Sequence, residues 1–531
     1  MVVYHSFALI RFVALFIGIA LLLAASPRGE AAPAQLIVAR VKDAVGLDPA
    51  HETDGLSLNV TAEVLQGLVG FKPGTFDVIG VLANSWTSSG GRRWTFTLRH
   101  GLRFSDGTPV DAAAVKFNFD RWRLRNNPYH GNDIYPYYEA VFGGFPGKLI
   151  DVRVDAPDRI TFVLSAPMAT FLRVLAMPSF AIGSPKAIAA DPRGYARRPV
   201  GSGPYELADW VKDDHITLVA NPTFAGPKPR YTTVTLRDIP DEATSVLSLE
   251  KGEIDGLTDL RSDDARVLAA NKNLRVYRQP SNNVAYLALN LEQKPFGDVR
   301  VRRAIAYALD LGAIARGLYG PDASVANTFL PPGMLGDDPA LRAYPRDLGR
   351  ARALLAQAGF PHGFSTSLYY GTAPRPYLPD PQRVAEAIAG QLRDAGITVT
   401  LQPFEWGVFL AKIRNGEHPM CLIGWTGDDG DPDNFLYTLL DRDAARKGSA
   451  QNYSFWRDPR FHALMLAGQT SLDPRRRAEI YRRALRMVHD DVPVVPLVHT
   501  SVPFAMKASV ENVIPRPDSI LNFELMKPRS S

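Results

Sequence analysis

The sequence predicts a mixed α/β protein with two or three lobes. Its 531 residues are more than one compact core normally holds. Apolar and polar residues alternate at 92–98 and 159–164, as they do in β-strands. Val301, Ile305 and Leu309 recur at helical spacing, which predicts an α-helix in the middle of the chain. Strands and helices are therefore both expected throughout.

The sequence pattern predicts secondary structure most clearly in the C-terminal third of the chain. Val384, Ile388 and Leu392 repeat at helical spacing, and Gly396 is a suitable residue to end that helix. Strand–helix–strand units pair their strands in parallel and cover the sheet with helix. The predicted order is a helix at 381–395, a strand at 397–402, a helix at 405–415 and a buried strand at 420–425.

A cluster of aspartates follows the last of these strands. The stretch GWTGDDGDPDNF carries four of them, Asp428, Asp429, Asp431 and Asp433. Open α/β sheets bind ligands outside the carboxyl ends of their strands. The position of this acidic loop (residues 427–433) therefore makes it a candidate site.

Three interpretations of the acidic loop are open. As a calcium loop it fails, because an EF-hand needs glycine at its sixth position and glutamate at its twelfth. Asp429 and Asp431 have the spacing of some metal-dependent transferase sites, but no other catalytic motif accompanies them. The third interpretation is capture of a ligand ammonium group by Asp428 beside an apolar wall formed by Trp425. Asp433, with Asp431, is typical of turn and helix-capping residues.

Charge and cysteine content narrow the class of protein. The net charge is +5 and the basic residues are scattered, so no nucleic-acid partner is expected. The single cysteine, Cys421, lies in an apolar run and is predicted to be buried, so no intramolecular disulfide forms. A large core must stabilise the fold without covalent links.

The N-terminus is predicted to be a cleavable signal peptide at 1–34. Arg11 precedes the apolar run 12–25, and small residues follow, which allows cleavage after Ala31 or Ala34. The alternative is a membrane anchor, but the run is shorter than the about 20 residues that span a bilayer. No cysteine near the cleavage region could be lipidated. We therefore expect a protein free in the periplasm.

Long motifs in a fixed order resemble the bacterial extracellular solute-binding proteins of family 5, in particular the dipeptide-binding proteins of ABC importers. The resemblance covers nearly the whole chain after the signal peptide. It rests on GLVGFKPGTFDVIGVLANSW (67–86), LRHGLRFSDGTPVDAAAVKFNFDR (98–121), GSGPYELADW (201–210), KGEIDG (251–256) and VRRAIAYALD (301–310). The acidic loop and NPYHG (127–131) are similar to the dipeptide-binding branch.

The resemblance implies two charged contacts with a ligand. Asp428 matches the family aspartate that pairs with the α-ammonium group. Arg375, in APRPY, matches the arginine that receives the α-carboxylate. An arginine suits this role because its planar fork donates two parallel hydrogen bonds to a carboxylate.

The resemblance also implies an uncharged lining of the site. Tyr377 and Trp425 match residues of the side-chain pockets, and Gly427 precedes the ligand-binding aspartate. Thr53 and Gly55, in HETDG, fall where the first segment of the family approaches the ligand backbone. No metal ligand and no cofactor are expected.

The fold that the resemblance implies is a type II periplasmic-binding-protein-like α/β fold, with two closing lobes and an inserted third domain away from the cleft. The expected divisions are lobe I at 35–77, 206–278 and 499–531, the inserted domain II at 78–205, and lobe III, carrying the charged contacts, at 279–498.

The expected function is capture of dipeptides for an ABC importer, without catalysis. The membrane permease subunits of the importer would be the protein partners of a monomer. Two alternatives stay open: another ligand within the family, such as an oligopeptide, haem or a nickel complex, or the metal-dependent transferase that uses Asp429 and Asp431.

Overall fold

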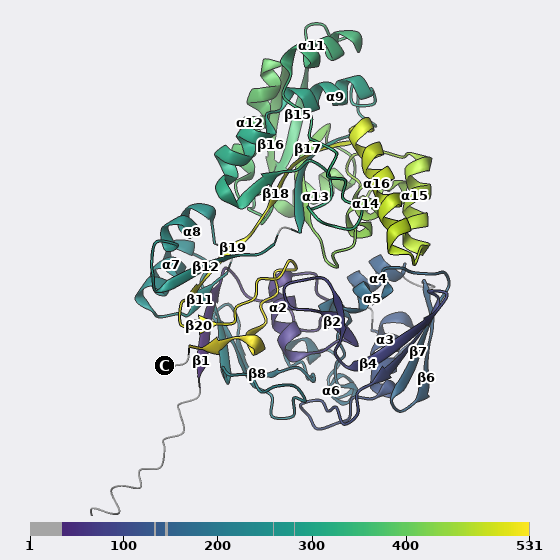
Figure 1. Ribbon diagram of the computed structural model, residues 1–531, viewed down its shortest axis with the longest axis vertical. Helices are drawn as coiled ribbons and strands as arrows, with labels where there is room; N and C mark the ends of the chain where they lie inside the picture. Colours follow the sequence, from purple (N-terminus) through teal and green to yellow (C-terminus); the bar gives the residue numbers. More distant parts are fainter. Residues whose placement is uncertain (1–33, 132–133, 144–146, 259, 281, 530–531) are drawn as a thin grey trace, which may run out of the picture.

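The structure is a computed structural model that describes residues 34–131, 134–143, 147–258, 260–280 and 282–529. Sheets of seven, four and six strands organise these residues, each with helices beside it (Figure 1). The six-stranded sheet lies in the upper part of Figure 1, and the other two lie below it. The predicted mixed α/β class is confirmed.

The seven-stranded sheet draws its strands from both ends of the described chain. Its order is β12-β19-β11-β1-β10-β9-β8. β1 pairs in parallel with β10 and β11, whereas β19 lies between β12 and β11 and is antiparallel to both. Its strands are β1 (Gln35–Arg40), β8 (Tyr205–Val211), β9 (His215–Ala220), β10 (Thr233–Asp238), β11 (Gly256–Leu257), β12 (Leu274–Arg278) and β19 (Pro503–Lys507). Beside it lie α2 (Gly55–Val64), α7 (Glu242–Lys251) and α8 (Ser262–Leu268).

The four-stranded sheet is antiparallel throughout, in the order β4-β5-β7-β6. Its core is rich in aromatic side chains, including Phe96, Phe119 and Phe162. Its elements are β4 (Ala83–Ser89), β5 (Arg93–Leu98), β6 (Leu149–Ala156), β7 (Arg159–Leu164), α3 (Ala112–Arg123), α4 (Pro136–Phe142), α5 (Phe171–Leu175) and α6 (Pro185–Ala190). A short pair, β2 (Val69–Phe71) and β3 (Val78–Gly80), packs nearby.

The six-stranded sheet has the order β14-β18-β13-β17-β15-β16. Its strands are β13 (Asn283–Leu289), β14 (Ala323–Val325), β15 (Phe364–Gly371), β16 (Ile397–Phe404), β17 (Met420–Thr426) and β18 (Val494–Thr500). Its helices are α9 (Val299–Ala308), α10 (Leu311–Ile314), α11 (Leu348–Gln357), α12 (Pro381–Asp394), α13 (Trp406–Arg414), α14 (Asp433–Leu440), α15 (Pro459–Thr470) and α16 (Pro474–Asp491). Far along the chain, β20 (Val510–Glu511) pairs with β21 (Lys527–Pro528).

Helices cover both faces of the six-stranded sheet, which explains why its central strands are apolar along their whole length. In β13 every residue is buried. Leu287 contributes to the core with α9 and α12, and its neighbour Tyr286 contributes to the opposite core with α13 and α16. Successive side chains of a strand point to opposite faces, so a strand covered on both sides has no polar face.

Parallel pairing brings two loops of this sheet to one edge. β15 pairs in parallel with both β16 and β17. The predicted strand–helix–strand unit is therefore present, but β15 lies between its two strands. The loops after β15 (372–380) and after β17 (427–432) leave the sheet at the same edge, because the carboxyl ends of parallel strands meet there.

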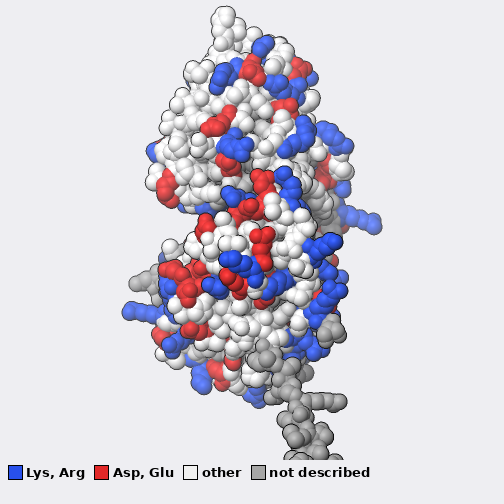
Figure 2. All heavy atoms as spheres, turned by 90° about the vertical axis from the view of Figure 1, so that its left-hand side faces the viewer, with Lys and Arg blue, Asp and Glu red and all other residues white. Residues whose placement is uncertain are grey.

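The predicted signal peptide lies outside the described residues, apart from residue 34. No helix in the described ranges is both long and apolar enough to cross a bilayer. Figure 2 shows positive and negative side chains interspersed over the face that it presents. Cys421 is buried in β17, as predicted. The divisions at residues 78, 206, 279 and 499 stay a prediction.

Candidate functional site

Asp428 lies in the loop after β17, and a small hydrogen-bond network surrounds its carboxylate. Tyr137 Oη donates to Asp428 Oδ1 at 2.8 Å, and Asn434 Nδ2 donates to Oδ2 at 3.0 Å. The N–H of Asp428 donates to Asn434 Oδ1 at 3.1 Å. Burial raises the pKa of Asp428, and the hydrogen bonds from Asn434 and Tyr137 oppose that rise. Within the described residues no basic side chain pairs with this carboxylate.

Tyr137 is a site residue that the sequence analysis missed. It belongs to α4, beside the four-stranded sheet. From α5 of the same region, Arg173 Nη1 donates to the carbonyl oxygens of Asp429 and Phe76, each at 3.1 Å. These two helices, which fall within the range 78–205 expected for the inserted domain, therefore contact the acidic loop. The only signal in the sequence is the run of tyrosines at 135–138, which does not reveal a partner so distant in the chain.

Hydrogen bonds also hold Trp425 and Gly427, the first through Asn434 and the second through Asn282. Trp425 is half-buried, and its Nε1 donates to Asn434 Oδ1 at 2.9 Å. The N–H of Gly427 donates to the carbonyl of Asn282 at 2.7 Å, and Asn282 Nδ2 donates back to the Gly427 carbonyl at 2.6 Å. A Cβ atom at residue 427 would lie 2.5 Å from the ring of Phe435. Close packing thus requires glycine here, and its backbone groups are already engaged.

Arg375 lies in the loop after β15 and carries a positive charge, opposite to that of the Asp428 carboxylate. Its N–H and carbonyl exchange hydrogen bonds with those of Leu378 at 3.0 and 2.8 Å, which closes a tight turn. Its guanidinium carbon lies 3.8 Å from the ring centroid of Trp406. Arg375 Nε is buried without a hydrogen-bond acceptor, and no carboxylate among the described residues pairs with the guanidinium. Arg375 is therefore a cation without a counter-charge.

Tyr377 connects the Arg375 loop to β17. Its side chain is 8% exposed, and its ring lies where a Cβ atom at Gly424 would be, only 2.3 Å from that position. Burial raises the pKa of Tyr377. The carbonyl of Tyr377 accepts a hydrogen bond from Tyr319 Oη at 3.4 Å. Tyr377 thus contributes to the core of the six-stranded sheet.

Asp431 is structural. Arg477 Nη1 and Nη2 donate to its two oxygens at 2.9 and 2.8 Å, and both side chains are buried. Asp431 Oδ1 also accepts from the N–H of Asp433 at 3.0 Å, as the capping interpretation predicts. Asp433 itself is the first residue of α14 rather than its cap. Asp429 is buried beside Asp431, and burial together with the Asp431 charge raises its pKa.

Metal ligation is better matched elsewhere in the chain than at Asp429 and Asp431. Within the described ranges, the group of side chains close enough to share an ion is Asp441, Asp443 and His462. His462 Nδ1 lies 2.9 Å from Asp441 Oδ1, so an ordinary histidine–carboxylate pair accounts for that group. Asp431 already has both oxygens bonded to Arg477, which removes half of the proposed transferase pair.

Thr53 and Gly55 lie at the start of α2, beside the seven-stranded sheet, and both are exposed. Asp54 caps this helix by accepting from the N–H of Ser57 at 3.0 Å. A Cβ atom at Gly55 would meet nothing within 4 Å, so the backbone there is open to a ligand. The structure brings Asp428, Arg375 and Tyr377 to one sheet edge, whereas Thr53 and Gly55 belong to a separate part of the molecule.

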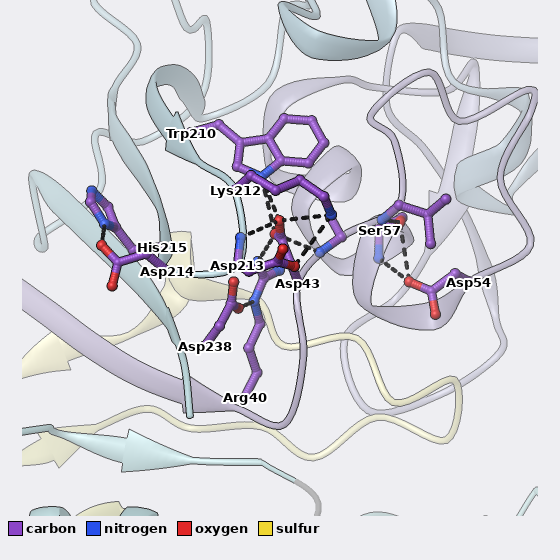
Figure 3. Close-up of polar contacts among 12 residues, drawn as sticks. Arg40, Asp43, Asp54, Ser57, Trp210, Lys212, Asp213, Asp214, His215 and Asp238 are labelled. Atoms are coloured by element: carbon purple, nitrogen blue, oxygen red, sulfur yellow. Dashed lines mark hydrogen bonds and ion pairs between the residues drawn. The ribbon is translucent and has the colours of Figure 1, made fainter. Parts of the chain in front are cut away.

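A polar cluster around Asp43 fixes the segment between β1 and α2 (Figure 3). Asp43 accepts from Arg40 Nη2 at 2.8 Å, from Trp210 Nε1 at 3.0 Å and from the N–H of Asp213 at 3.0 Å. Burial alone would raise the pKa of Asp43, but the hydrogen bonds, first that from Asp213, lower it below its ordinary value. The cluster gives the segment that carries Thr53 a rigid base.

The chain belongs to the bacterial extracellular solute-binding proteins, family 5, whose model matches residues 77–446. A dipeptide-binding protein of Escherichia coli K12 is 33% identical over 494 residues, which is 90% of this chain and 92% of that protein. Heme-binding protein A of Haemophilus influenzae is 32% identical over 479 residues, 87% of this chain and 86% of that protein. The periplasmic binding protein DppA of Helicobacter pylori, solved with the peptide STSA, has a TM-score of 0.81 at 31% identity and covers 93% of this chain and 98% of that one. The predicted family and its fold are confirmed.

Proposed function

We propose that this protein is the substrate-binding component of an ABC importer and that it binds dipeptides by their two charged termini. The observation that carries the proposal is a pair of opposite charges, Asp428 and Arg375, on loops that leave one edge of the six-stranded sheet; neither has a counter-charge among the residues that the structure describes. A zwitterion would supply both missing charges at once. The dipeptide-binding relative in Escherichia coli supports the choice of ligand.

Selection by length follows from the distance between the termini of the ligand. The termini of an extended dipeptide lie about 6–7 Å apart, and a third residue adds about 3.3–3.6 Å. A tripeptide would leave either Asp428 or Arg375 unpaired in a closed site. An unpaired buried charge costs about 3–5 kcal/mol, which corresponds to about two to four decades of affinity. A single amino acid is too short to reach both.

The present partners of Asp428 are compatible with an added ammonium group. An ionised carboxylate has about four acceptor positions. Tyr137 and Asn434 occupy one on each oxygen. An ammonium group can therefore bind without displacing them, and the three donors together would hold the carboxylate ionised.

Binding would favour closure of the lobes, because the ligand contacts more than one of them in the closed form. The permease subunits of the importer would then recognise the closed shape. We place the protein in the periplasm, after removal of the segment 1–34, as a monomer without cofactor and without catalytic activity.

Calorimetric titration with alanine, Ala-Ala and Ala-Ala-Ala tests the proposal directly. Ala-Ala is expected to bind at least about tenfold more tightly than either of the others. Native mass spectrometry of the purified protein provides a second test, because it identifies any ligand that copurifies. A copurifying haem or longer peptide, together with no binding of Ala-Ala, would contradict the dipeptide assignment and leave the family unchanged.

A further inference from the structure

We propose that Trp406 is a positioning residue: its indole ring holds the guanidinium of Arg375 in place and leaves the hydrogen-bonding edges of that group free for a ligand carboxylate. The inference rests on the proposed function, and it explains how the arginine that binds the ligand carboxylate is oriented before the ligand arrives. It starts from the 3.8 Å distance between the guanidinium carbon of Arg375 and the ring centroid of Trp406.

Two buried arginines, Arg477 and Arg121, are each paired with a carboxylate, although each also lies near a tyrosine ring. Arg477 donates two hydrogen bonds to Asp431, and Arg121 forms an ion pair with Asp48. A carboxylate partner neutralises the cation and occupies its N–H groups, so such an arginine has little left to offer a ligand. Arg375 has no such partner within the described residues, and its Nε lacks an acceptor.

An aromatic ring can hold an arginine without occupying its N–H groups, because the face of the ring attracts the cation. Cation–π attraction is strongest for tryptophan, and it leaves the N–H groups of the guanidinium in their own plane unbonded. A ligand carboxylate can then approach in that plane and accept two parallel hydrogen bonds. Without the ring, a free arginine side chain must lose rotamer entropy when the ligand binds, which weakens binding.

The indole is itself fixed, as a positioning residue must be. Trp406 is the first residue of α13, and Glu405 caps that helix by accepting from the N–H of Gly407 at 2.8 Å. A Cβ atom at Gly371, the last residue of β15, would lie 2.8 Å from the Trp406 ring. Phe409, one turn along α13, packs against the indole with ring centroids 5.7 Å apart. The absence of a side chain at residue 371 thus allows the ring to lie against the strand end from which the Arg375 loop departs.

The backbone of Arg375 is fixed independently of Trp406. The turn to Leu378 holds its main chain, and Thr500 Oγ1 donates to the carbonyl of Pro376 at 3.0 Å. Removal of the indole would therefore free the guanidinium and leave the loop in place. The effect should appear only for ligands that carry a free carboxylate.

The test compares two ligands that differ only at that group, Ala-Ala and Ala-Ala amide, by calorimetry with the wild-type protein, Trp406→Leu and Trp406→Phe. Trp406→Leu is expected to weaken binding of Ala-Ala about tenfold and binding of the amide less than about twofold. Trp406→Phe keeps an aromatic face and should restore most of the affinity for Ala-Ala. Equal losses for both ligands in Trp406→Leu would overturn the positioning role. Wild-type protein that binds neither ligand would overturn the proposed function instead, so the two failures are distinct.

A measurement on the wild-type protein covers the case in which Trp406→Leu does not fold. The Nε–H resonance of Arg375, assigned by its loss in Arg375→Lys, is expected upfield of ordinary arginine resonances, because the indole ring current shields a group above its face. An unshifted resonance would contradict the stacking and with it the proposed role.

Discussion

At the scale of single residues, Asp428 and Arg375 each lack an ion-pair partner in the part of the chain that the structure describes. Asp431, which belongs to the same acidic loop as Asp428, forms an ion pair with Arg477, so these two charges neutralise each other. A buried ion pair of that kind stabilises or orders the fold but has no charge left for a ligand. Asp428 and Arg375, rather than Asp431, are therefore the charges assigned to binding.

Replacement of either charge is expected to weaken binding of Ala-Ala at least about tenfold without unfolding the protein. Asp428→Asn keeps the shape of the side chain but removes the charge that pairs with ammonium, and it leaves one acceptor oxygen where Tyr137 and Asn434 now use two. Arg375→Ala removes the donor fork for the carboxylate; a buried charge left alone costs about 3–5 kcal/mol. Calorimetry measures the affinity, and thermal unfolding measures the stability.

Asp443→Asn is the matched control for the aspartate, because its side chain is about half exposed and lies outside the acidic loop. It should leave the affinity unchanged. Unchanged affinity in both Asp428→Asn and Arg375→Ala would remove the two-charge account of binding.

At the scale of elements, the start of α14 contains a carboxyl group that should make stability depend on pH. Burial and the charge of Asp431 raise the pKa of Asp433 to about 7. Gln469 Nε2 donates to Asp433 Oδ2 at 3.1 Å, and Asp433 Oδ1 is buried without a partner. The nearby charges of Lys148 and Arg477 oppose the rise in pKa but do not cancel it.

The sign of the effect follows from the raised pKa. The folded protein holds the Asp433 proton more tightly than the unfolded chain does, so this group favours the folded state below about pH 4 and progressively loses that contribution as the pH rises through about 7. Asp433→Asn, which stays neutral, should be more stable than the wild type at pH 8 and should show a flatter dependence of Tm on pH between 5 and 8. Asp263→Asn, with an exposed side chain in α8, is the control. A wild-type Tm that does not fall relative to that of Asp433→Asn over this range would contradict the prediction.

Some elements could be predicted from the sequence, whereas the order of the strands and the contacts between distant segments could not. The helix 381–395 and the strand 420–425 were predicted almost to the residue, because periodicity and Gly396 are local signals. The insertion of β15 between β16 and β17 was not predictable, since strand order depends on contacts between distant segments. Tyr137 was missed for the same reason: its partner Asp428 is 291 positions away. Trp406 lies in the predicted helix 405–415, but its contact with Arg375 required coordinates.

At the scale of the whole molecule, α4 and α5 contact the acidic loop from the side of the four-stranded sheet. Tyr137 and Arg173 reach it from these helices, and the N–H of Ala169 donates to the carbonyl of Gln469 at 2.8 Å. Such contacts hold α4 and α5 against the acidic loop, and a hinge opening that separates the two would break them. Each hydrogen bond contributes about 0.5–1.5 kcal/mol.

Arg173→Ala removes one of these bonds, that to the carbonyl of Asp429, and should shift the ligand-free protein toward the open form. We expect a larger radius of gyration without ligand, measured by small-angle X-ray scattering, and an affinity for Ala-Ala that is about twofold to tenfold lower. Saturating Ala-Ala should restore the wild-type radius, because the ligand favours closure. Arg153→Ala, on the far strand β6, is the control and should change neither quantity. An unchanged ligand-free radius in Arg173→Ala would argue against this contact as a determinant of closure.

The position of β19 in the seven-stranded sheet has a consequence for how the protein must be made. Because β19 lies between β11 and β12, until residues 503–507 have been synthesised β11 is paired only with β1, and β12 has no partner strand among the described residues. A chain truncated before that point would keep two unsatisfied strand edges, which are templates for aggregation. Premature termination or C-terminal proteolysis of the nascent polypeptide should therefore yield insoluble material rather than a shortened protein.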